Sequence, residues 1–233
     1  MSPDARREQL AAGLEAVRAR IARACDDAGR DPAEVTLVVV TKFFPASDVR
    51  LLAGLGVTDV GENRHQEAAE KSRECGDLGL RWHFIGGLQS NKAAAVAGYA
   101  DAVHSVDRAK LVAPLDRGAA ERRVDVLLQV SLDPPDASGR AGADPEDLGA
   151  LADTVEAAEH LRLRGLMAVA PLGEDPAQAF ARLAEIRRTF LSQHPGATWL
   201  SAGMSNDLEQ AVAAGATHVR IGSAVLGSRP RFQ

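Results

Sequence analysis

The chain alternates between two patterns of apolar and polar positions. Short runs that are apolar at nearly every position, and rich in β-branched residues, predict strands buried on both faces. Longer segments with apolar residues three or four positions apart predict helices with one buried face. Strands are predicted at 35–42, 58–63, 81–86, 101–106, 124–131, 163–170, 198–204 and 217–227. Helices are predicted between them at 47–56, 63–75, 90–100, 107–122, 144–160, 175–193 and 205–215.

A further helix is predicted before the first strand, over about residues 5–29. Gly29 fits its end, because glycine readily adopts the left-handed conformation that terminates many helices. In the helix at 47–56, Ser47 or Asp48 is predicted to act as the N-terminal cap. The apolar positions that share one face of the first helix are Leu10, Leu14, Val17, Ile21 and Cys25.

The alternation of strands and helices predicts an α/β fold with a parallel sheet. Eight strand–helix units fit a single closed (β/α)8 TIM-type barrel with an additional N-terminal helix. We expect one domain over residues 1–233, with the barrel at about 35–229. An open doubly wound sheet is the alternative, but that fold usually has a glycine-rich turn after its first strand. This chain reads KFFPAS there.

The composition is that of a soluble globular protein, with 45% hydrophobic and 25% charged residues. The formal net charge is −5 and the two signs are interspersed, which argues against a nucleic-acid partner. No apolar run is long enough to span a membrane, and the charged N-terminus lacks a signal-peptide core. We therefore expect a cytoplasmic protein without membrane association. Cys25 and Cys75 are expected to be reduced and structural.

Lys42 ends the first predicted strand, and the reactive groups of (β/α)8 barrels lie at the C-terminal ends of their strands. In a partly apolar pocket, a lysine amine loses some of its preference for the charged form. The neutral amine can then condense with an aldehyde to form a Schiff base. The alternative is a lysine whose side chain extends from the strand end into solvent.

Two stretches of small residues follow the last two strands, where barrels of this class usually bind phosphate. In 200–215, Ser205 is predicted to cap a helix, with Asp207 and Glu209 in its first turn. Backbone N–H groups at such a helix start form an anion site. After the eighth strand, 222–223 reads Gly-Ser. Either stretch alone fits an ordinary turn, whereas together they predict a phosphate site.

A lysine after the first strand and a phosphate site after the last two describe a ligand with both an aldehyde and a phosphate. Pyridoxal 5′-phosphate (PLP) is the common cofactor of that kind. From these residues alone, a barrel that binds another phosphorylated metabolite is the alternative.

Over roughly residues 8–229, the chain resembles the pyridoxal phosphate homeostasis proteins (YggS/PROSC-like), which are relatives of the N-terminal barrel of alanine racemase. The resemblance implies a protein that binds, buffers and hands over PLP inside the cell without dedicated catalytic turnover. A PLP-dependent amino-acid racemase is the alternative. The matching motifs are VTK at 40–42, VGEN at 60–63, QE at 66–67, WHFIGGLQSNK at 82–92, HSVD at 104–107, GLMAV at 165–169, GMSND at 203–207 and VRIGSAVLG at 219–227.

The resemblance also implies a role for each matching position. Lys42 would form the internal aldimine with PLP, and Asn63 would lie beside the cofactor ring. Arg220 would face the pyridine nitrogen and keep it unprotonated, because a guanidinium can only donate. A neutral ring is a weak electron sink. The residues that would hold the phosphate are Met204, Ser205, Gly222 and Ser223. For Arg220, a surface ion pair is the alternative.

The chain departs from the family in two places. Many relatives follow the aldimine lysine with a polar residue and a second lysine, where this chain has Phe43 and Phe44. Many also have a lysine in the loop after the fifth strand, where residues 132–142 contain Arg140 as their only base. A secondary lysine site for the cofactor is therefore not expected.

Several other polar residues allow two interpretations. His83 lies in mid-strand and is interpreted as a hydrogen-bonded core histidine rather than a catalyst. Gln89, Asn91 and Lys92 either line the barrel mouth or start the next helix. Glu62 either supports the neighbouring cofactor residue or forms an ion pair inside the barrel.

The six histidines show no metal-ligand spacing, so no structural zinc is predicted. The only tyrosine, Tyr99, ends the helix after the third strand, and we expect it outside the barrel or at its N-terminal rim. In the related racemase, a tyrosine from a separate β domain supplies the second base. This chain ends at Gln233, so we expect no such domain and a monomer. PLP-dependent enzymes that lack their cofactor are the expected recipients.

Overall fold

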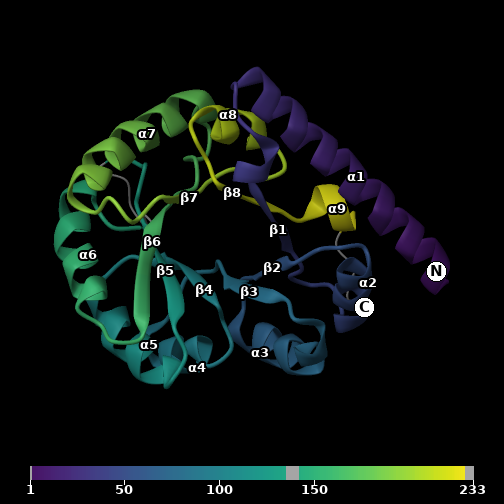
Figure 1. Ribbon diagram of the computed structural model, residues 1–233, viewed down its shortest axis with the longest axis horizontal. Coiled ribbons are helices and arrows are strands. Elements are labelled where there is room, and N and C mark those ends of the chain that lie inside the picture. Colours follow the sequence, from purple (N-terminus) through teal and green to yellow (C-terminus); the bar gives the residue numbers. More distant parts are fainter. Residues whose placement is uncertain (1, 135–141, 229–233) are drawn as a thin grey trace.

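Parallel strands form a closed barrel in the computed structural model, which describes residues 2–134 and 142–228 (Figure 1). Each strand pairs with the next, and β1 closes the barrel by pairing with β8, with Val38 opposite Arg220. The predicted (β/α)8 barrel with an N-terminal helix is therefore confirmed. The strands are β1 (Thr36–Val40), β2 (Asp59–Glu62), β3 (Arg81–Phe84), β4 (Ala102–Val106), β5 (Val124–Gln129), β6 (Leu161–Met167), β7 (Trp199–Ser201) and β8 (His218–Ile221).

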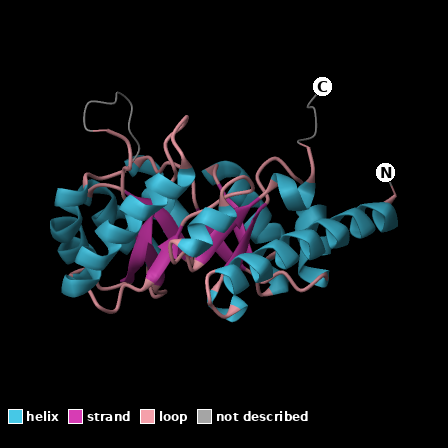
Figure 2. Ribbon diagram, turned by 90° about the horizontal axis from the view of Figure 1, so that it is seen from above, coloured by secondary structure: helices cyan, strands magenta, loops and turns pink. Residues whose placement is uncertain are grey.

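Helices surround the strands on the outside of the barrel (Figures 1 and 2). Parallel strands need such a cover because both of their faces are apolar. None of the helices in the described ranges is long and apolar enough to cross a membrane. The helices are α1 (Pro3–Asp27), α2 (Ala46–Gly54), α3 (His65–Glu74), α4 (Ala93–Ala97), α5 (Val112–Ala119), α6 (Leu148–Glu156), α7 (Pro176–Gln193), α8 (Leu208–Ala213) and α9 (Ser223–Leu226).

The N-terminal helix α1 packs against α8 and α9, where it continues the outer layer (Figure 1). All five residues predicted to share its inner face are buried. The packing is close, since a Cβ atom at Gly13 would lie 2.5 Å from the carbonyl oxygen of Val225. The helix ends just before Gly29, whose φ of 64° is the predicted left-handed stop.

The last strand is shorter than predicted. β8 ends at Ile221, and 223–226 form the helix α9 instead of continuing the strand. The apolar run continues through this helix because Val225 and Leu226 are buried against the α1 side of the core. A continuous apolar run therefore did not distinguish a strand from a short buried helix.

The helix α2 begins one position earlier than predicted. Its N-terminal residue is Ala46 and the cap position is taken by Pro45, so neither Ser47 nor Asp48 caps the helix. The Asp48 carboxylate accepts instead from the Arg6 guanidinium of α1, with an Nε–Oδ1 distance of 3.2 Å. The Asp48 carboxylate is therefore engaged by a charged partner on another helix and does not accept from the first N–H groups of α2.

Apolar side chains fill the space between the strands and the helices in two clusters. One cluster joins α1 and α2 to β1, β2 and β8, and the other joins α4–α7 to β4–β7. Each fully buried leucine, such as Leu52 or Leu127, contributes about 1.5–3 kcal/mol to folding. Cys25 and Cys75 are buried in the first cluster as free thiols, as predicted.

Several polar side chains lie in the interior of the barrel, although barrels of this class are usually filled with branched apolar residues. His104 of β4 hydrogen-bonds Ser201 of β7 at 2.9 Å, and this contact crosses the interior because the two strands are not neighbours. His83 is 1% exposed and hydrogen-bonds both His104 and Asp59, so its prediction as a core histidine is confirmed. The ring of His218 lies 6.2 Å from each of these two imidazole rings.

Burial opposes the protonation of two of these histidines. It lowers the pKa of His104 well below the ordinary value and lowers the pKa of His218 to about 3. In the unfolded chain, a histidine has a pKa near 6.5. Between about pH 6.5 and pH 3 the unfolded state therefore binds more protons than the native state, so the free energy of unfolding falls as the pH falls.

We expect the free energy of unfolding, measured by urea titration, to decrease when the pH is lowered from 6.5 to 5. His218 alone should account for about 2 kcal/mol of the decrease. Ordinary carboxylates titrate mainly below this window. His218→Gln keeps a polar side chain but not its titration, so the variant should lose stability less steeply. Equal slopes for the two proteins would contradict this assignment.

Candidate functional site

A cavity of about 700 Å³ opens at the C-terminal end of the barrel. Most of its wall comes from residues at or beyond the ends of five consecutive strands around the barrel, β6, β7, β8, β1 and β2. All seven residues predicted to bind the cofactor line this cavity, so the fold brings together positions from both halves of the sequence. They are Lys42, Asn63, Met204, Ser205, Arg220, Gly222 and Ser223.

Lys42 lies two residues beyond the end of β1, and the backbone on both sides of it is held by hydrogen bonds. The N–H of Thr41 donates to the carbonyl of Gly61 at 3.0 Å, and the N–H of Phe43 donates to Glu67 Oε1 at 2.6 Å. Phe43 has a φ of 70°, which is costly for an aromatic residue. The surrounding structure therefore enforces the direction in which the chain presents Lys42.

A buried lysine on α3, Lys71, anchors this strand end. Its Nζ donates to the carbonyl of Thr41 at 2.8 Å, to Glu62 Oε1 at 2.7 Å and to Glu67 Oε1 at 2.6 Å. Burial raises the pKa of Glu62, and the charge of Lys71 opposes that effect. Glu62 thus forms an ion pair, but the pair lies between β2 and α3. Its predicted place inside the barrel is wrong, because α3 covers the outer face.

Asn63 follows β2 and leaves one polar atom without a partner. Its Oδ1 is buried and accepts no hydrogen bond within residues 2–134 and 142–228. Such an atom costs free energy unless water or a ligand donates to it. Phe43 and Phe44 line the same cavity. The Arg64 guanidinium lies 5.0 Å from the centre of the Phe43 ring, which supports this apolar wall.

Arg220 is 5% exposed, which excludes the alternative of a surface ion pair. Its Nη1 donates to Ser201 Oγ at 2.6 Å and its Nη2 donates to the carbonyl of Ala168 at 2.9 Å. Burial lowers the pKa of Arg220 to about 10, so it remains charged at neutral pH. Its hydrogen-bond acceptors in the described structure are neutral, and a buried charge of this kind favours an acceptor in the adjoining cavity.

The loop after β7 turns sharply at Gly203, whose φ is 89°. The prediction that Ser205 caps the following helix is wrong, because α8 begins at Leu208 and Asp207 occupies the cap position. Asp207 Oδ1 accepts from the backbone N–H of Met204 at 2.5 Å and closes the turn. Ser205 is therefore displaced from the helix and lines the cavity.

The two loops predicted to bind phosphate meet at their serines. Ser205 Oγ and Ser223 Oγ lie 3.4 Å apart. Arg20 of α1 donates from Nη1 to the carbonyl of Ser205 at 3.0 Å and fixes the first loop from outside. Gly222 precedes α9, and the first N–H groups of a helix have no acceptor within it. Hydroxyl and N–H donors therefore gather at one end of the cavity.

The rim of the cavity is apolar, a feature that sequence reasoning missed. The large hydrophobic side chains that are exposed in the described part of the chain are Val169, Leu172 and Met204, and all three line this cavity. Leu172 is fully exposed. Contiguous exposed apolar residues commonly mark binding sites on proteins.

Some predicted positions do not belong to the cavity. Gln89, Asn91 and Lys92 start the helical segment after β3, and the N–H of Lys92 donates to the carbonyl of Gln89 at 2.9 Å. Their interpretation as helix-start residues therefore holds. Arg140 lies outside the described residues.

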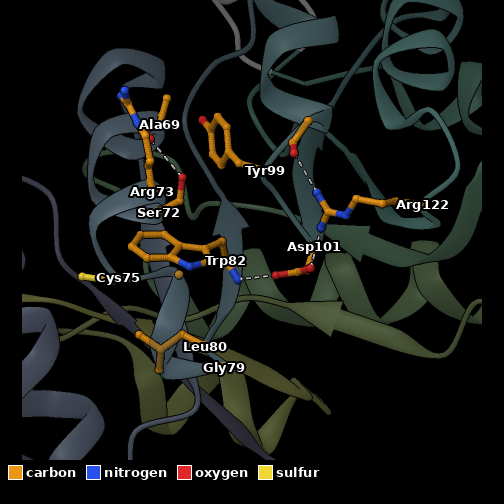
Figure 3. Close-up of a pocket in the computed structure, with 12 residues that line it drawn as sticks. Ala69, Ser72, Arg73, Cys75, Gly79, Leu80, Trp82, Tyr99, Asp101 and Arg122 are labelled. Atoms are coloured by element: carbon orange, nitrogen blue, oxygen red, sulfur yellow. Dashed lines mark hydrogen bonds and ion pairs between the residues drawn. The ribbon is translucent and has the colours of Figure 1, made fainter.

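A second hollow lies on the outside of the barrel, next to α3 and the end of α4 (Figure 3). It contains Tyr99, the only tyrosine of the chain, together with Trp82 and Arg122. Burial raises the pKa of Tyr99, and its ring stacks on the His65 ring with 5.8 Å between the ring centres. Tyr99 does not line the cavity that contains Lys42, as predicted.

One group of potential metal ligands occurs among the described residues. Asp153, Glu156 and His194 could each offer one ligand atom, but both carboxylates are exposed. His194 Nδ1 lies 3.2 Å from Glu156 Oε2, a direct contact that needs no metal ion between them. The group lies on α6 and at the end of α7, away from the cavity, and the absence of a structural zinc stays a prediction.

Comparisons with known proteins agree with this geometry. The family model described as "Alanine racemase, N-terminal domain" matches residues 13–230. A pyridoxal phosphate homeostasis protein of Pseudomonas aeruginosa is 47% identical, over 94% of this chain and 96% of that protein. One of Mycobacterium tuberculosis is 42% identical, over 97% and 95%.

A solved structure is also similar along nearly the whole chain. PipY of Synechococcus elongatus, with PLP bound, superposes with a TM-score of 0.80 at 38% identity. The match covers 94% of this chain and 100% of that one. This chain therefore belongs to the family of pyridoxal phosphate homeostasis proteins, whose barrel is that of the alanine racemase N-terminal domain.

Proposed function

We propose that this protein binds PLP in the cavity at the barrel mouth, bonded to Lys42, and acts in PLP homeostasis by buffering and transferring the cofactor. It acts as a single-domain monomer in the cytoplasm, and PLP-dependent enzymes that lack their cofactor are its recipients. The names of its relatives and the PLP-bound PipY structure support this proposal.

The observation that carries the proposal is the convergence of three kinds of group on one cavity. Lys42 supplies an amine that can bond to an aldehyde. Ser205 and Ser223 bring two hydroxyls together beside the start of a helix, which suits a phosphate. The unpartnered Oδ1 of Asn63 and the buried guanidinium of Arg220 provide polar groups for a heteroaromatic ring. These residues fit PLP.

The charge at Arg220 favours holding the cofactor over catalysis. When bound, PLP supplies a ring that withdraws electrons from an amino acid's α-carbon. A guanidinium can only donate, and with a pKa of about 10 that of Arg220 stays charged at neutral pH. A ring nitrogen that accepts from it remains unprotonated and withdraws electrons weakly. Carbanion chemistry is therefore poorly supported, which favours a carrier over the racemase alternative.

Lys42→Ala should abolish the covalent PLP adduct that borohydride traps in the parent protein. The variant lacks the amine but keeps the serines and Arg220, so weak non-covalent binding should persist. The chain has only four lysines, so peptide mass spectrometry can locate the pyridoxyl group. Lys92→Ala removes a lysine outside the cavity, so this control variant should give the same yield of trapped adduct as the parent protein. A full-yield adduct on another lysine of Lys42→Ala would show the assignment to be wrong.

Ser205→Ala and Ser223→Ala should each weaken PLP binding about tenfold or more, because charge-assisted hydrogen bonds contribute roughly 1.5–3 kcal/mol. Binding can be followed by the visible absorbance of the protein. Pyridoxal, which lacks the phosphate, should bind the parent poorly and be nearly insensitive to both changes. Ser192→Ala, on the exposed face of α7, is the matched control. Equal weakening of both ligands would argue against a phosphate contact.

The protein should not racemise L-alanine at an enzymatic rate. Racemisation needs a base on each face of the substrate, and the only tyrosine, Tyr99, lies in a different hollow from Lys42 (Figure 3). A missing general base typically costs 10²–10⁴-fold. The measurement is proton exchange and inversion at the α-carbon in deuterated water. Formation of D-alanine at about 1 per second or faster would favour the racemase.

A further inference from the structure

Five polar side chains form one hydrogen-bonded chain through the barrel interior, from its N-terminal end to the cavity. Arg220 Nη1 donates to Ser201 Oγ at 2.6 Å, and Ser201 Oγ lies 2.9 Å from His104 Nδ1. His104 Nε2 lies 2.9 Å from His83 Nδ1, and His83 Nε2 lies 2.8 Å from Asp59 Oδ1. All five residues are 6% exposed or less.

The chemistry of the two ends gives this chain a direction. Burial by itself raises the pKa of Asp59. Its hydrogen-bonded neighbours, His83 above all, lower that pKa by more than burial raises it, so the pKa of Asp59 lies below its ordinary value. Asp59 is therefore a carboxylate and can only accept, here from His83 Nε2–H. With neutral imidazoles, His83 Nδ1 accepts from His104 Nε2–H, and His104 Nδ1 accepts from the Ser201 hydroxyl. Ser201 Oγ then accepts from Arg220, which can only donate.

The opposite direction would require an additional buried charge. His83 would have to be an imidazolium that donates at both nitrogens, and it would share the interior with the Arg220 guanidinium. Arg81 adds a further positive charge, with its Nη1 4.0 Å from Asp59 Oδ1. Burial lowers the pKa of the adjoining His104 and His218, so both rings stay neutral and neither can offset a positive charge on His83. The neutral relay leaves one charge at each end and avoids the cost of a third.

The chain leaves the Arg220 guanidinium little freedom. Nη1 is bound to Ser201, Nη2 is bound to the carbonyl of Ala168, and a planar guanidinium with both terminal nitrogens held is fixed in orientation. We propose that Ser201, His104, His83 and Asp59 are positioning residues, a one-way relay that fixes Arg220 as a donor at the wall where the cofactor ring binds. The identity of this ligand rests on the proposed function, whereas the direction of the relay is a property of the chain alone.

A role in packing alone does not account for this arrangement. Branched apolar residues usually fill such a barrel, and each polar group placed there costs free energy unless it is hydrogen-bonded. Here each of the two imidazoles has one partner for each ring nitrogen, and the partners lead without a gap from Asp59 to Arg220. An unbroken series of donors and acceptors is needed if Asp59 is to influence the orientation of Arg220.

The first test is made on the full-length protein before PLP is added. Spectra of ¹⁵N-histidine-labelled protein at pH 8 distinguish the two neutral tautomers of an imidazole from its protonated form. The expected result is that His83 and His104 are both neutral Nε2–H tautomers. An Nδ1–H tautomer or an imidazolium at either position would overturn the relay.

The second test compares two buried carboxylates at the same end of the barrel. Asp59→Asn replaces an obligate acceptor with an amide that can accept or donate, so the direction is no longer imposed. Asp125→Asn is the matched control, because Asp125 pairs with Arg81 and Arg162, both at 2.9 Å, and does not belong to the relay. The readouts are the His83 tautomer, the dissociation constant for PLP and the absorption maximum of bound PLP.

Asp59→Asn should mix the His83 tautomers, shift the absorption maximum and raise the dissociation constant roughly fivefold. Asp125→Asn should keep the tautomer and the spectrum of the parent, with a dissociation constant within about twofold of it. Identical behaviour of the two variants, or parent-like readouts for Asp59→Asn, would overturn the positioning role.

A third variant keeps the relay testable if Asp59→Asn does not fold. Ser201→Ala removes one acceptor of Arg220, so the absorption maximum of bound PLP should shift, whereas His104, whose tautomer is set from Asp59 through His83, should keep its Nε2–H form. An unchanged spectrum of bound PLP would show the positioning role to be wrong. Failure of the proposed function is distinguishable: a parent protein with the expected tautomers but no Lys42 adduct would refute PLP binding and leave the direction of the relay intact.

Discussion

A guanidinium buried in the interior of a closed barrel is the constraint on which the rest of the site depends. Arg220 lies on the inner face of β8, where its charge must be met by hydrogen-bond acceptors. Ser201 and the carbonyl of Ala168 meet part of that requirement. A line of polar side chains follows, because a serine brought inside needs its own partner, and His104 provides it. One charge at the cavity thus explains why polar side chains extend across the barrel interior.

Lys42 and Arg220, to which the proposed function gives the most direct roles, are supported from opposite faces of the sheet. Arg220 is held from inside the barrel, whereas the backbone before Lys42 is held from outside by Lys71 of α3, through the carbonyl of Thr41. β1 and β8 are paired neighbours, so the two supports act on adjacent strands. A change in the packing of α3 would therefore alter the position of Lys42 without altering the hydrogen bonds of the relay.

Much of this architecture could be predicted because it depends on local pattern. Apolar runs placed all eight strands, and the position of Lys42 after the first and of small residues after the last two predicted the cavity. Element ends were less predictable: 223–226 is apolar whether it forms a strand or packs as a helix against α1. The Ser205 cap failed because Asp207 competes for the same turn.

The contacts that support the site could not be predicted in the same way. Lys71 has a local signal, its spacing of four from Glu67, but that spacing is equally common on solvated helix faces. Its bond to the carbonyl of Thr41 depends on how α3 lies over β1 and β2. The relay joins β2, β3, β4, β7 and β8, so it exists only once the barrel is closed.

The different surroundings of the two lysines near this strand end would explain why only one of them takes part in the covalent binding proposed above. Lys71 Nζ donates three hydrogen bonds, two of them to carboxylates, and three is the number of donors that an ammonium has. An amine held in this way has no lone pair to offer to an aldehyde. Lys42 lines the cavity, where the proposed function makes its amine the group that bonds to the aldehyde. The same ion-pair cluster that occupies Lys71 therefore holds the backbone that presents Lys42 to the cavity.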